Sequence, residues 1–156
     1  MKKNLVALFA LLMIGFSACA QKNISYIRMQ RSACFGRCPV YWVEVYKNGL
    51  VRYSGNRFTE HMGVYEKNIG TANAAALFRH FGAYRTDTCK RSYDVLISDL
   101  PGIYYKIVAG RKTKRIDNAH FGPGFLKELA QSVDSLAMVD RSWKKVADTA
   151  LMSSLK

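Results

Sequence analysis

The chain has 156 residues, of which 49% are hydrophobic and 22% charged, and its formal net charge is +13. These proportions are those of a globular protein, and the length is sufficient for one domain and short for two. A basic surface favours an anionic partner, such as lipid phosphate or an acidic glycan.

The N-terminus has the layout of an export signal. Lys2 and Lys3 precede an apolar run over 5–16 that ends in small residues; a secretory signal peptide has this order, and the run is too short to span a bilayer. We therefore expect residues 1–18 to be a signal peptide. Its removal lowers the formal charge from +13 to +11. Export argues against nucleic acid as the partner, and the sequence has no recognition motif for it.

Two interpretations of the cleavage site stay open. The sequence F-S-A-C at 16–19 resembles the lipobox of bacterial lipoproteins, which would make Cys19 the lipidated first residue. The alternative is ordinary cleavage after Ala20, which would release a soluble periplasmic or secreted protein. We favour lipid attachment at Cys19, because this cysteine lies where the apolar run ends. No early aspartate and no acidic run follow it, so we expect an outer membrane lipoprotein on the periplasmic face rather than the cell surface.

Three further cysteines would lie in an oxidising compartment. Cys34 and Cys38 are four positions apart, and Gly36 between them permits the tight turn that a bridge requires. We expect a structural disulfide here, worth about 2 kcal/mol for so small a loop, with Cys89 free or partly buried. Two other interpretations stay open. A thiol-redox pair would favour two intervening residues ahead of a helix, and a zinc site would need Cys89 with His61, His80 or His120, without a second close pair of ligands.

The strongest strand pattern covers 41–46, which is rich in aromatic and β-branched residues, and an Asn-Gly hairpin signal follows it. A two-residue loop would mix charged and apolar side chains on both faces. A three-residue loop over 47–49, with Gly49 in the left-handed region, gathers the apolar side chains on one face. We therefore predict the three-residue loop. The predicted pairs are Tyr46–Leu50, Val45–Val51, Glu44–Arg52 and Val43–Tyr53.

After this hairpin the pattern alternates between strands and helices. Thr71 is a good N-cap for the first helix, and Gly82 stops it. Pro123 lies near the first turn of the second helix. The stretch 83–100 has no clear period and is expected to be an irregular connection, closed by a turn at 98–102. The expected strands cover 41–46, 50–53, 56–69, 102–109 and 113–117, and the expected helices cover 72–81 and 125–138.

Short turns between the strands favour an antiparallel sheet. We therefore predict an α+β fold, with an antiparallel sheet of about five strands and two helices packed on one face. The domain is expected to cover 27–138, after a linker at 19–26 that follows the lipid anchor. Residues 139–156 are expected to form a C-terminal tail with a short helix from Asp140. The densest basic run, 111–115, is expected to be a solvated hairpin tip.

Four separated pieces resemble a bacterial family of exported proteins, the domain of unknown function 6438. Together they cover about 27–136, and the resemblance implies export, often with a lipid anchor. It supplies no catalytic residue. The matching pieces are C-F-G-R-C-P-V-Y at 34–41, the hairpin with Gly49, Gly63 with Tyr65, and D-L-P at 99–101.

We expect a non-catalytic binding or structural domain without a cofactor or metal. Its candidate binding residues are Arg37, Trp42, Tyr46 and Asp99, of which exposed Trp42 and Tyr46 would contact an envelope protein or an anionic envelope polymer. The alternatives are an enzyme and a thiol-redox helper that uses Cys34 and Cys38. Against an enzyme, the sequence has no nucleophile elbow, no paired carboxylates at a telling spacing and no His-rich motif.

Two tight turns each lead directly into a strand, one at 34–39 and one at 99–101. Backbone N–H groups in such turns need acceptors, and Asp99 is a short side chain of the kind that supplies one. We therefore predict that the two turns lie at one end of the sheet, where Asp99 accepts backbone hydrogen bonds. The functional alternative is that Asp99 and Arg37 point together into a small polar pocket.

Overall fold

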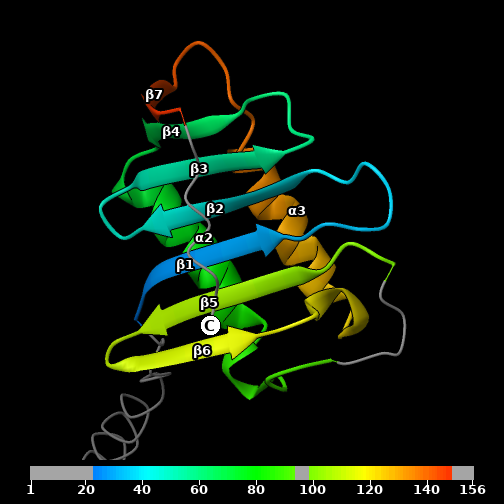
Figure 1. Ribbon diagram of the computed structural model, residues 1–156. Coiled ribbons are helices and arrows are strands. Elements are labelled where there is room, and N and C mark those ends of the chain that lie inside the picture. The colour runs from blue at the N-terminus through cyan, green and yellow to red at the C-terminus, as the bar shows by residue number, and fades with distance from the viewer. Residues whose placement is uncertain (1–22, 94–98, 149–156) are drawn as a thin grey trace, which may run out of the picture.

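The computed structural model describes residues 23–93 and 99–148. In these ranges the chain forms one antiparallel sheet of seven strands, in the order β6-β5-β1-β2-β3-β4-β7, and two α-helices (Figure 1). The strands are β1 (Ile24–Arg31), β2 (Val40–Tyr46), β3 (Leu50–Arg57), β4 (Gly63–Asn68), β5 (Ile103–Ala109), β6 (Lys112–Ile116) and β7 (Lys144–Ala147). The α-helices are α2 (Thr71–Ala83) and α3 (Phe125–Leu136), and the short 3-10 helices are η2 (Thr86–Thr88) and η3 (Ala119–Phe121).

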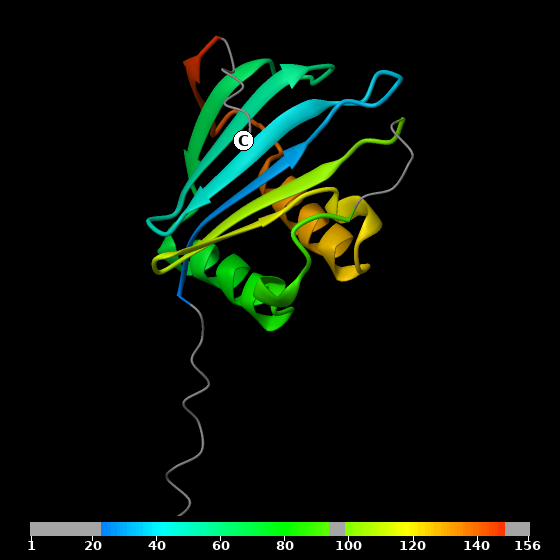
Figure 2. The same ribbon diagram turned by 60° about the horizontal axis from the view of Figure 1, so that its bottom comes forward.

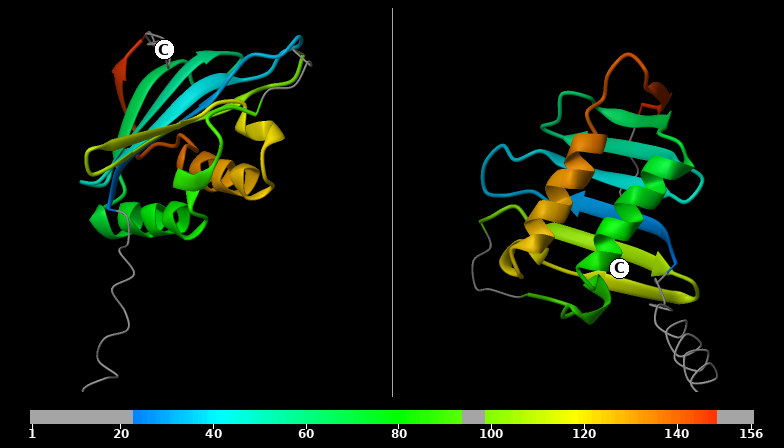
Figure 3. Two further views of the ribbon diagram at one scale, coloured as in Figure 1. Left: turned by 90° about the horizontal axis from the view of Figure 1, so that it is seen from below. Right: turned by 180° about the vertical axis from the view of Figure 1, so that it is seen from behind.

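The core lies between the sheet and the helices, which cover the same face (Figure 3). Successive side chains of a strand point to opposite faces, and the apolar set points toward α2 and α3. Phe81 of α2 packs edge-on against Tyr105 of β5, with 5.7 Å between the ring centroids. The Tyr105 hydroxyl donates to the main-chain oxygen of Leu126 on α3 at 2.7 Å, so the buried phenol is satisfied. Other fully buried side chains are Ile27, Met29, Val43, Val45, Val51, Ile103, Ile116, Leu129 and Val133.

The predicted register of the β2–β3 hairpin is confirmed. Glu44 pairs with Arg52 and Val45 with Val51, and Gly49 has a φ of 87°. A Cβ on Gly49 would lie 2.5 Å from the backbone of Gly70, so both the turn and this close approach require glycine.

The predicted α+β class with two helices is confirmed, but the predicted number of about five strands is wrong. Two strands were not among those predicted: β1, the central strand that pairs with both β2 and β5, and β7, which pairs with β4. Because β1 begins at Ile24, the last three residues of the predicted linker belong to the sheet. After Asp140 the chain forms a turn and then β7, rather than the predicted short helix.

Several boundaries also differ from the predictions. Thr71 is the first residue of α2 rather than its N-cap, which is Gly70. The expected strand over 56–69 is divided between the end of β3 and β4, because a loop around Phe58 interrupts it. The predicted signal peptide, the lipidated Cys19 and positions 94–98 of the irregular connection lie outside the described residues. Among the described residues, no helix is long and apolar enough to cross a membrane.

The sheet has two ends that differ in composition. The first, here called the disulfide end, consists of the loops at 32–39, 58–62 and 99–102. The second, here called the turn end, consists of Asn23 and the turns at 47–49 and 110–111. Figure 2 shows these two turns beside the start of β1. Hydrogen bonds from Lys47 N to Ser25 O (3.0 Å) and from Gly110 N to Asn23 O (3.3 Å) hold them there.

Candidate functional site

A disulfide closes the loop that connects β1 to β2. Cys34 and Cys38 are bridged, with 5.7 Å between their α-carbons, as predicted, and the Gly36 N–H lies 3.3 Å from Cys34 Sγ. Cys89 is a free and buried thiol. Within 23–93 and 99–148, no group of three or more His, Cys, Asp or Glu side chains is placed to hold a metal ion.

The two turns that the sequence predicts at one end of the sheet do lie together. Phe35 N donates to the main-chain oxygen of Asp99 at 3.4 Å, and Ser32 N donates to Gly102 O at 3.1 Å. Gly102 N in return donates to Ser32 Oγ at 2.8 Å. Asp99 therefore accepts a backbone hydrogen bond, and the acceptor in this bond is its main-chain carbonyl. Arg37 lies at the same end, with its guanidinium 5.7 Å from the Phe58 ring centroid.

The disulfide end exposes large apolar side chains. Phe35 is 91% exposed and Met138, just after α3, is 75% exposed. Of the seven large hydrophobic side chains that are exposed among the described residues, five lie at or beside this end. We call these five the apolar patch: Phe35, Phe58, Met62, Leu100 and Met138.

Local chain geometry bears on two of these side chains, Phe35 and Phe58. The bridge confines Phe35 to a short loop outside the strands, where its ring is exposed. Phe58 has a φ of 55°, in the left-handed region that bulky residues rarely adopt. Such a conformation costs about 1–3 kcal/mol and is concentrated at functional sites. Arg57 and Arg37 flank its ring, with guanidinium carbons 5.1 and 5.7 Å from the centroid.

A cavity of about 300 Å³ lies behind the patch, lined by Phe58 and Met138 together with polar residues. One of its two carboxylates, Asp134 of α3, accepts hydrogen bonds from Tyr41 Oη at 2.5 Å and from Arg31 Nη2 at 2.5 Å. Burial, and then the bond to Asp134, raise the pKa of Tyr41. These hydrogen bonds connect α3 to β1 and β2. Because the two donors occupy the Asp134 carboxylate, it is not available as a general base. The other lining residues are Pro39, Tyr53, Thr59, Glu60, His61, Ala137 and Val139.

The sheet face opposite the helices holds Trp42 and Tyr46 of β2. The prediction that Trp42 is exposed is wrong, because only 5% of it is accessible. The Arg28 guanidinium of β1 lies 4.9 Å from the Trp42 ring centroid, and β1 was missing from the sequence-based fold. Tyr46 is half-buried against Tyr26, with 5.2 Å between the ring centroids.

Charges on this face pair with one another. Arg52 forms ion pairs with Glu66 at 2.6 Å and with Glu44 at 3.8 Å, and Tyr26 Oη donates to Glu44 at 2.5 Å. Burial is the main cause that raises the pKa of Tyr26, and the hydrogen bond to Glu44 raises it further. These pairs balance the charges of Arg52, Glu44 and Glu66, so they do not favour this face as a site for an anionic polymer.

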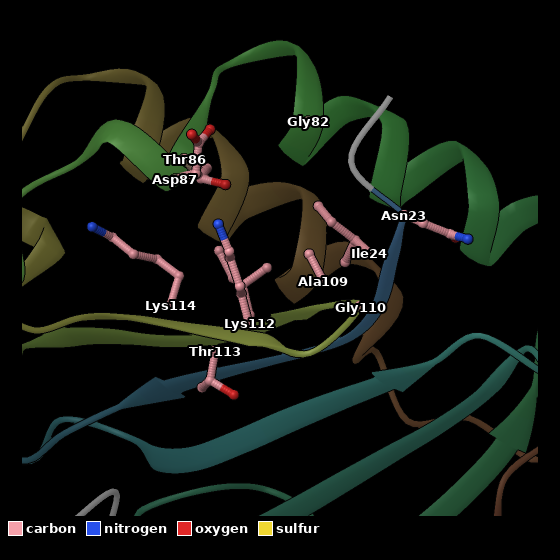
Figure 4. Close-up of a pocket in the computed structure, with 11 residues that line it drawn as sticks. Asn23, Ile24, Gly82, Thr86, Asp87, Ala109, Gly110, Lys112, Thr113 and Lys114 are labelled. Atoms are coloured by element: carbon pink, nitrogen blue, oxygen red, sulfur yellow. The ribbon is translucent and has the colours of Figure 1, made fainter. Parts of the chain in front are cut away.

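A second cavity, of about 500 Å³, lies at the turn end between the end of α2 and strands β1, β5 and β6 (Figure 4). Its lining is mostly apolar, with three charged residues, Asp87, Lys112 and Lys114. The Lys112 side chain points toward Asp87 in Figure 4, and Lys114 Nζ donates to the main-chain oxygen of Cys89. The lining holds one carboxylate and no histidine, so it lacks the pair of carboxylates, or the carboxylate and histidine, that acid–base catalysis most often uses.

The structure thus brings Arg37 and Asp99 together at the disulfide end and places Trp42 and Tyr46 on a different face. Sequence reasoning missed Phe35, Phe58, Met138 and Asp134. Phe35 carried a signal that could have been used, since an aromatic residue inside a short disulfide loop lies outside the strands that form the core. The others come together only through the fold.

Two comparisons with known proteins bear on this arrangement. A family described as "Domain of unknown function (DUF6438)" matches residues 25–137. No curated protein matches the chain.

Proposed function

The chain belongs to this family, DUF6438, whose function is unknown, and from that premise we propose that it is an exported, lipid-anchored envelope protein whose domain binds another envelope protein. In this proposal residues 1–18 are the signal peptide, and Cys19 carries the lipid on the periplasmic face of the outer membrane. The binding surface is the apolar patch at the disulfide end. The domain acts by binding and not by catalysis.

The exposure of the apolar patch is the observation that carries the proposal. Burying a Phe or Met side chain is worth about 1.5–3 kcal/mol relative to leaving it in water, so a fold gains nothing from displaying several together. Large exposed apolar side chains that gather on one part of a surface are characteristic of interaction sites. Aromatic residues, Met and Arg are also enriched at protein interfaces, and Arg37 and Arg57 flank Phe58 within this patch.

The loop that displays Phe35 is already fixed in place, which favours binding. The disulfide closes it, and the bond from Phe35 N to Asp99 O ties it to the neighbouring loop. A partner therefore has little conformational entropy to remove from this loop, a cost of about 0.5–1.5 kcal/mol for each flexible side chain that binding would otherwise order. The disulfide also suits an oxidising compartment outside the cytoplasm.

The alternatives have weaker support. An enzyme would need titratable groups free to react. In the cavity behind the patch Asp134 is bonded to Arg31 and Tyr41, which leaves Glu60 and His61 as the candidates. A thiol-redox site favours a cysteine at a helix N-terminus, whereas the segment after Cys38 continues into strand β2.

Site-specific photo-crosslinking in cells tests the binding proposal. A photoreactive residue at position 35 or 138 should crosslink one and the same envelope protein. The matched control is position 146 on β7, where Val146 is also exposed but lies outside the patch, and it should not yield this product. Equal yields of that product from position 146, or different products from 35 and 138, would contradict a shared binding surface.

The proposed anchor has a separate test. Mass spectrometry of the mature N-terminus should find acyl chains on Cys19. Stable anchoring requires more than one chain, since a single chain binds a bilayer only marginally. An unmodified start at Gln21 would contradict the anchor and leave the binding surface unaffected.

A further inference from the structure

The turn end is basic. Its two turns carry Lys47, Arg111 and the adjoining Lys112, all exposed. The segments 46–50 and 109–112 contain no acidic residue, and the acidic residue that Lys112 faces is Asp87 of the turn-end cavity (Figure 4). Lys47 and Arg111 form no ion pair within 23–93 and 99–148. The hydrogen bonds to Asn23 O and Ser25 O hold both turns beside the start of β1, so the cations gather at the point where the chain enters the domain.

The short distance from Cys19 to Asn23 restricts where this end can lie. The four steps between these residues span at most about 14 Å when fully extended. If Cys19 is lipidated, which is part of the proposed function, the start of β1 must stay within that distance of the bilayer surface. The tether therefore allows the basic turns to come within the Debye length of the bilayer surface, about 8 Å at physiological ionic strength, where lipid headgroup charge acts on them.

The direction of β1 determines which end of the sheet faces away from the membrane. The eight residues of β1 rise about 3.3 Å each, so the strand is roughly 25 Å long. It runs from the turn end to the disulfide end (Figure 1). An orientation that brings the turns to the membrane therefore holds the apolar patch away from it.

We propose that the turn end is the membrane-facing surface of the domain, where Lys47, Arg111 and Lys112 bind the phosphate groups of anionic lipids. The tether limits the domain's distance from the membrane, and the cations set its orientation. Each basic residue near an anionic surface strengthens binding about fivefold, so the three together contribute on the order of a hundredfold.

A vesicle-binding experiment isolates this contribution from the anchor. The mature chain with Cys19→Ser carries no acyl chain, so its co-sedimentation reports on the folded domain alone. It should bind vesicles of anionic phospholipid and not vesicles of neutral phospholipid, at about 0.15 M salt. Inorganic phosphate added in excess should leave binding largely intact, because a surface presents many headgroups together; full competition would point to a free phosphate ligand and overturn the lipid assignment.

Matched variants test the three residues. Lys47→Gln/Arg111→Gln/Lys112→Gln should weaken binding on the order of a hundredfold. The control Lys127→Gln/Arg141→Gln/Lys144→Gln removes the same charge from exposed positions outside the turn end and should change it only a few-fold. Equal loss in both triples would show a response to net charge and overturn the proposal.

Lysine modification in the lipidated protein then tests the orientation directly. On anionic vesicles a water-soluble amine reagent should modify Lys47 and Lys112 several-fold more slowly than in detergent, with Lys127 and Lys144 unchanged. Protection of Lys127 and Lys144 instead would place another surface on the membrane. Either negative result would leave the crosslinks from positions 35 and 138 intact, so the failure of this proposal is distinguishable from the failure of the binding function.

Discussion

The two ends of the sheet use different devices to hold their loops. At the disulfide end a covalent bridge and an ion pair, Arg31–Asp134, fix loops that display apolar rings. At the turn end glycines make the turns, with φ values of 87° at Gly49 and 57° at Gly110, and the exposed side chains are cationic. A loop that presents a specific surface to a protein must keep its shape, whereas cations that meet a lipid surface need only be near it.

The two ends of the strands therefore differ in chemistry: one end exposes apolar side chains and the other exposes cationic ones. The same β1 that begins near the proposed anchor ends at the disulfide loop, so one strand separates the end that we propose faces the membrane from the end that we propose binds a partner. The following changes should affect one end without the other, and they are ordered by the expected size of their effect.

Asp134→Ala should lower the free energy of unfolding by about 3 kcal/mol, because it removes the partner of both Arg31 and Tyr41, and hydrogen bonds to charged groups are worth about 1.5–3 kcal/mol each. Chemical denaturation at neutral pH measures the change. Asp148→Ala is the matched control, since Asp148 is 91% exposed in its pair with Lys145 and should leave stability unchanged. If the two variants were equally stable, Asp134 would not be what holds the disulfide end in place.

Cys34→Ser/Cys38→Ser should lower the free energy of unfolding by about 2 kcal/mol, the entropic value of closing so short a loop. The turn end should keep its vesicle affinity. The pairing itself is checked by alkylating the denatured, unreduced protein, in which Cys89 should be the one reactive thiol of the three in the domain. Three reactive thiols there would refute the bridge.

The turn end offers a matched pair of glycines. Gly49→Ala should destabilise by about 2 kcal/mol, because a Cβ would lie 2.5 Å from the backbone of Gly70 in addition to the positive φ. Gly110→Ala meets nothing within 4 Å and should cost about 1 kcal/mol, for the conformation alone. A larger loss in the free energy of unfolding for Gly110→Ala than for Gly49→Ala would show that the close approach to Gly70 does not restrict position 49.

Gly82→Ala should have the smallest effect and the opposite sign. Gly82 lies in the last turn of α2 beside the turn-end cavity, and a Cβ there meets nothing within 4 Å. Alanine should raise the free energy of unfolding by about 0.5 kcal/mol through its higher helix propensity. A decrease would indicate that the cavity wall is tighter than the structure has it.

Sequence reasoning succeeded where the determinants are local. The β2–β3 register follows from the alternation over 41–53 and one Asn-Gly turn, and the disulfide follows from two cysteines around Gly36. It failed where the determinants are distant. Arg31 looks out of place on the core face of β1 until Asp134, 103 residues away, is known as its partner. With β1 unrecognised, nothing could show that Arg28 covers Trp42.

The candidate surface was hard to foresee for a related reason. The cysteine–glycine–proline piece located the disulfide end, and Arg37 and Asp99 do lie there. The apolar patch instead collects residues from four separate segments, between Phe35 and Met138. Single exposed apolar residues carry no signal in a sequence, because nearly every globular surface has some; their convergence becomes visible only in the folded chain.

The affinity of the Phe35→Ser variant for the protein crosslinked from position 35 tests the central claim most directly. Because Phe35 is 91% exposed, this substitution should leave the free energy of unfolding within about 0.5 kcal/mol of wild type. It should weaken partner binding at least about tenfold, as expected for an aromatic anchor, while Val146→Ser leaves binding unchanged. Wild-type affinity in Phe35→Ser, with the fold intact, would contradict the assignment of the disulfide end as the binding surface.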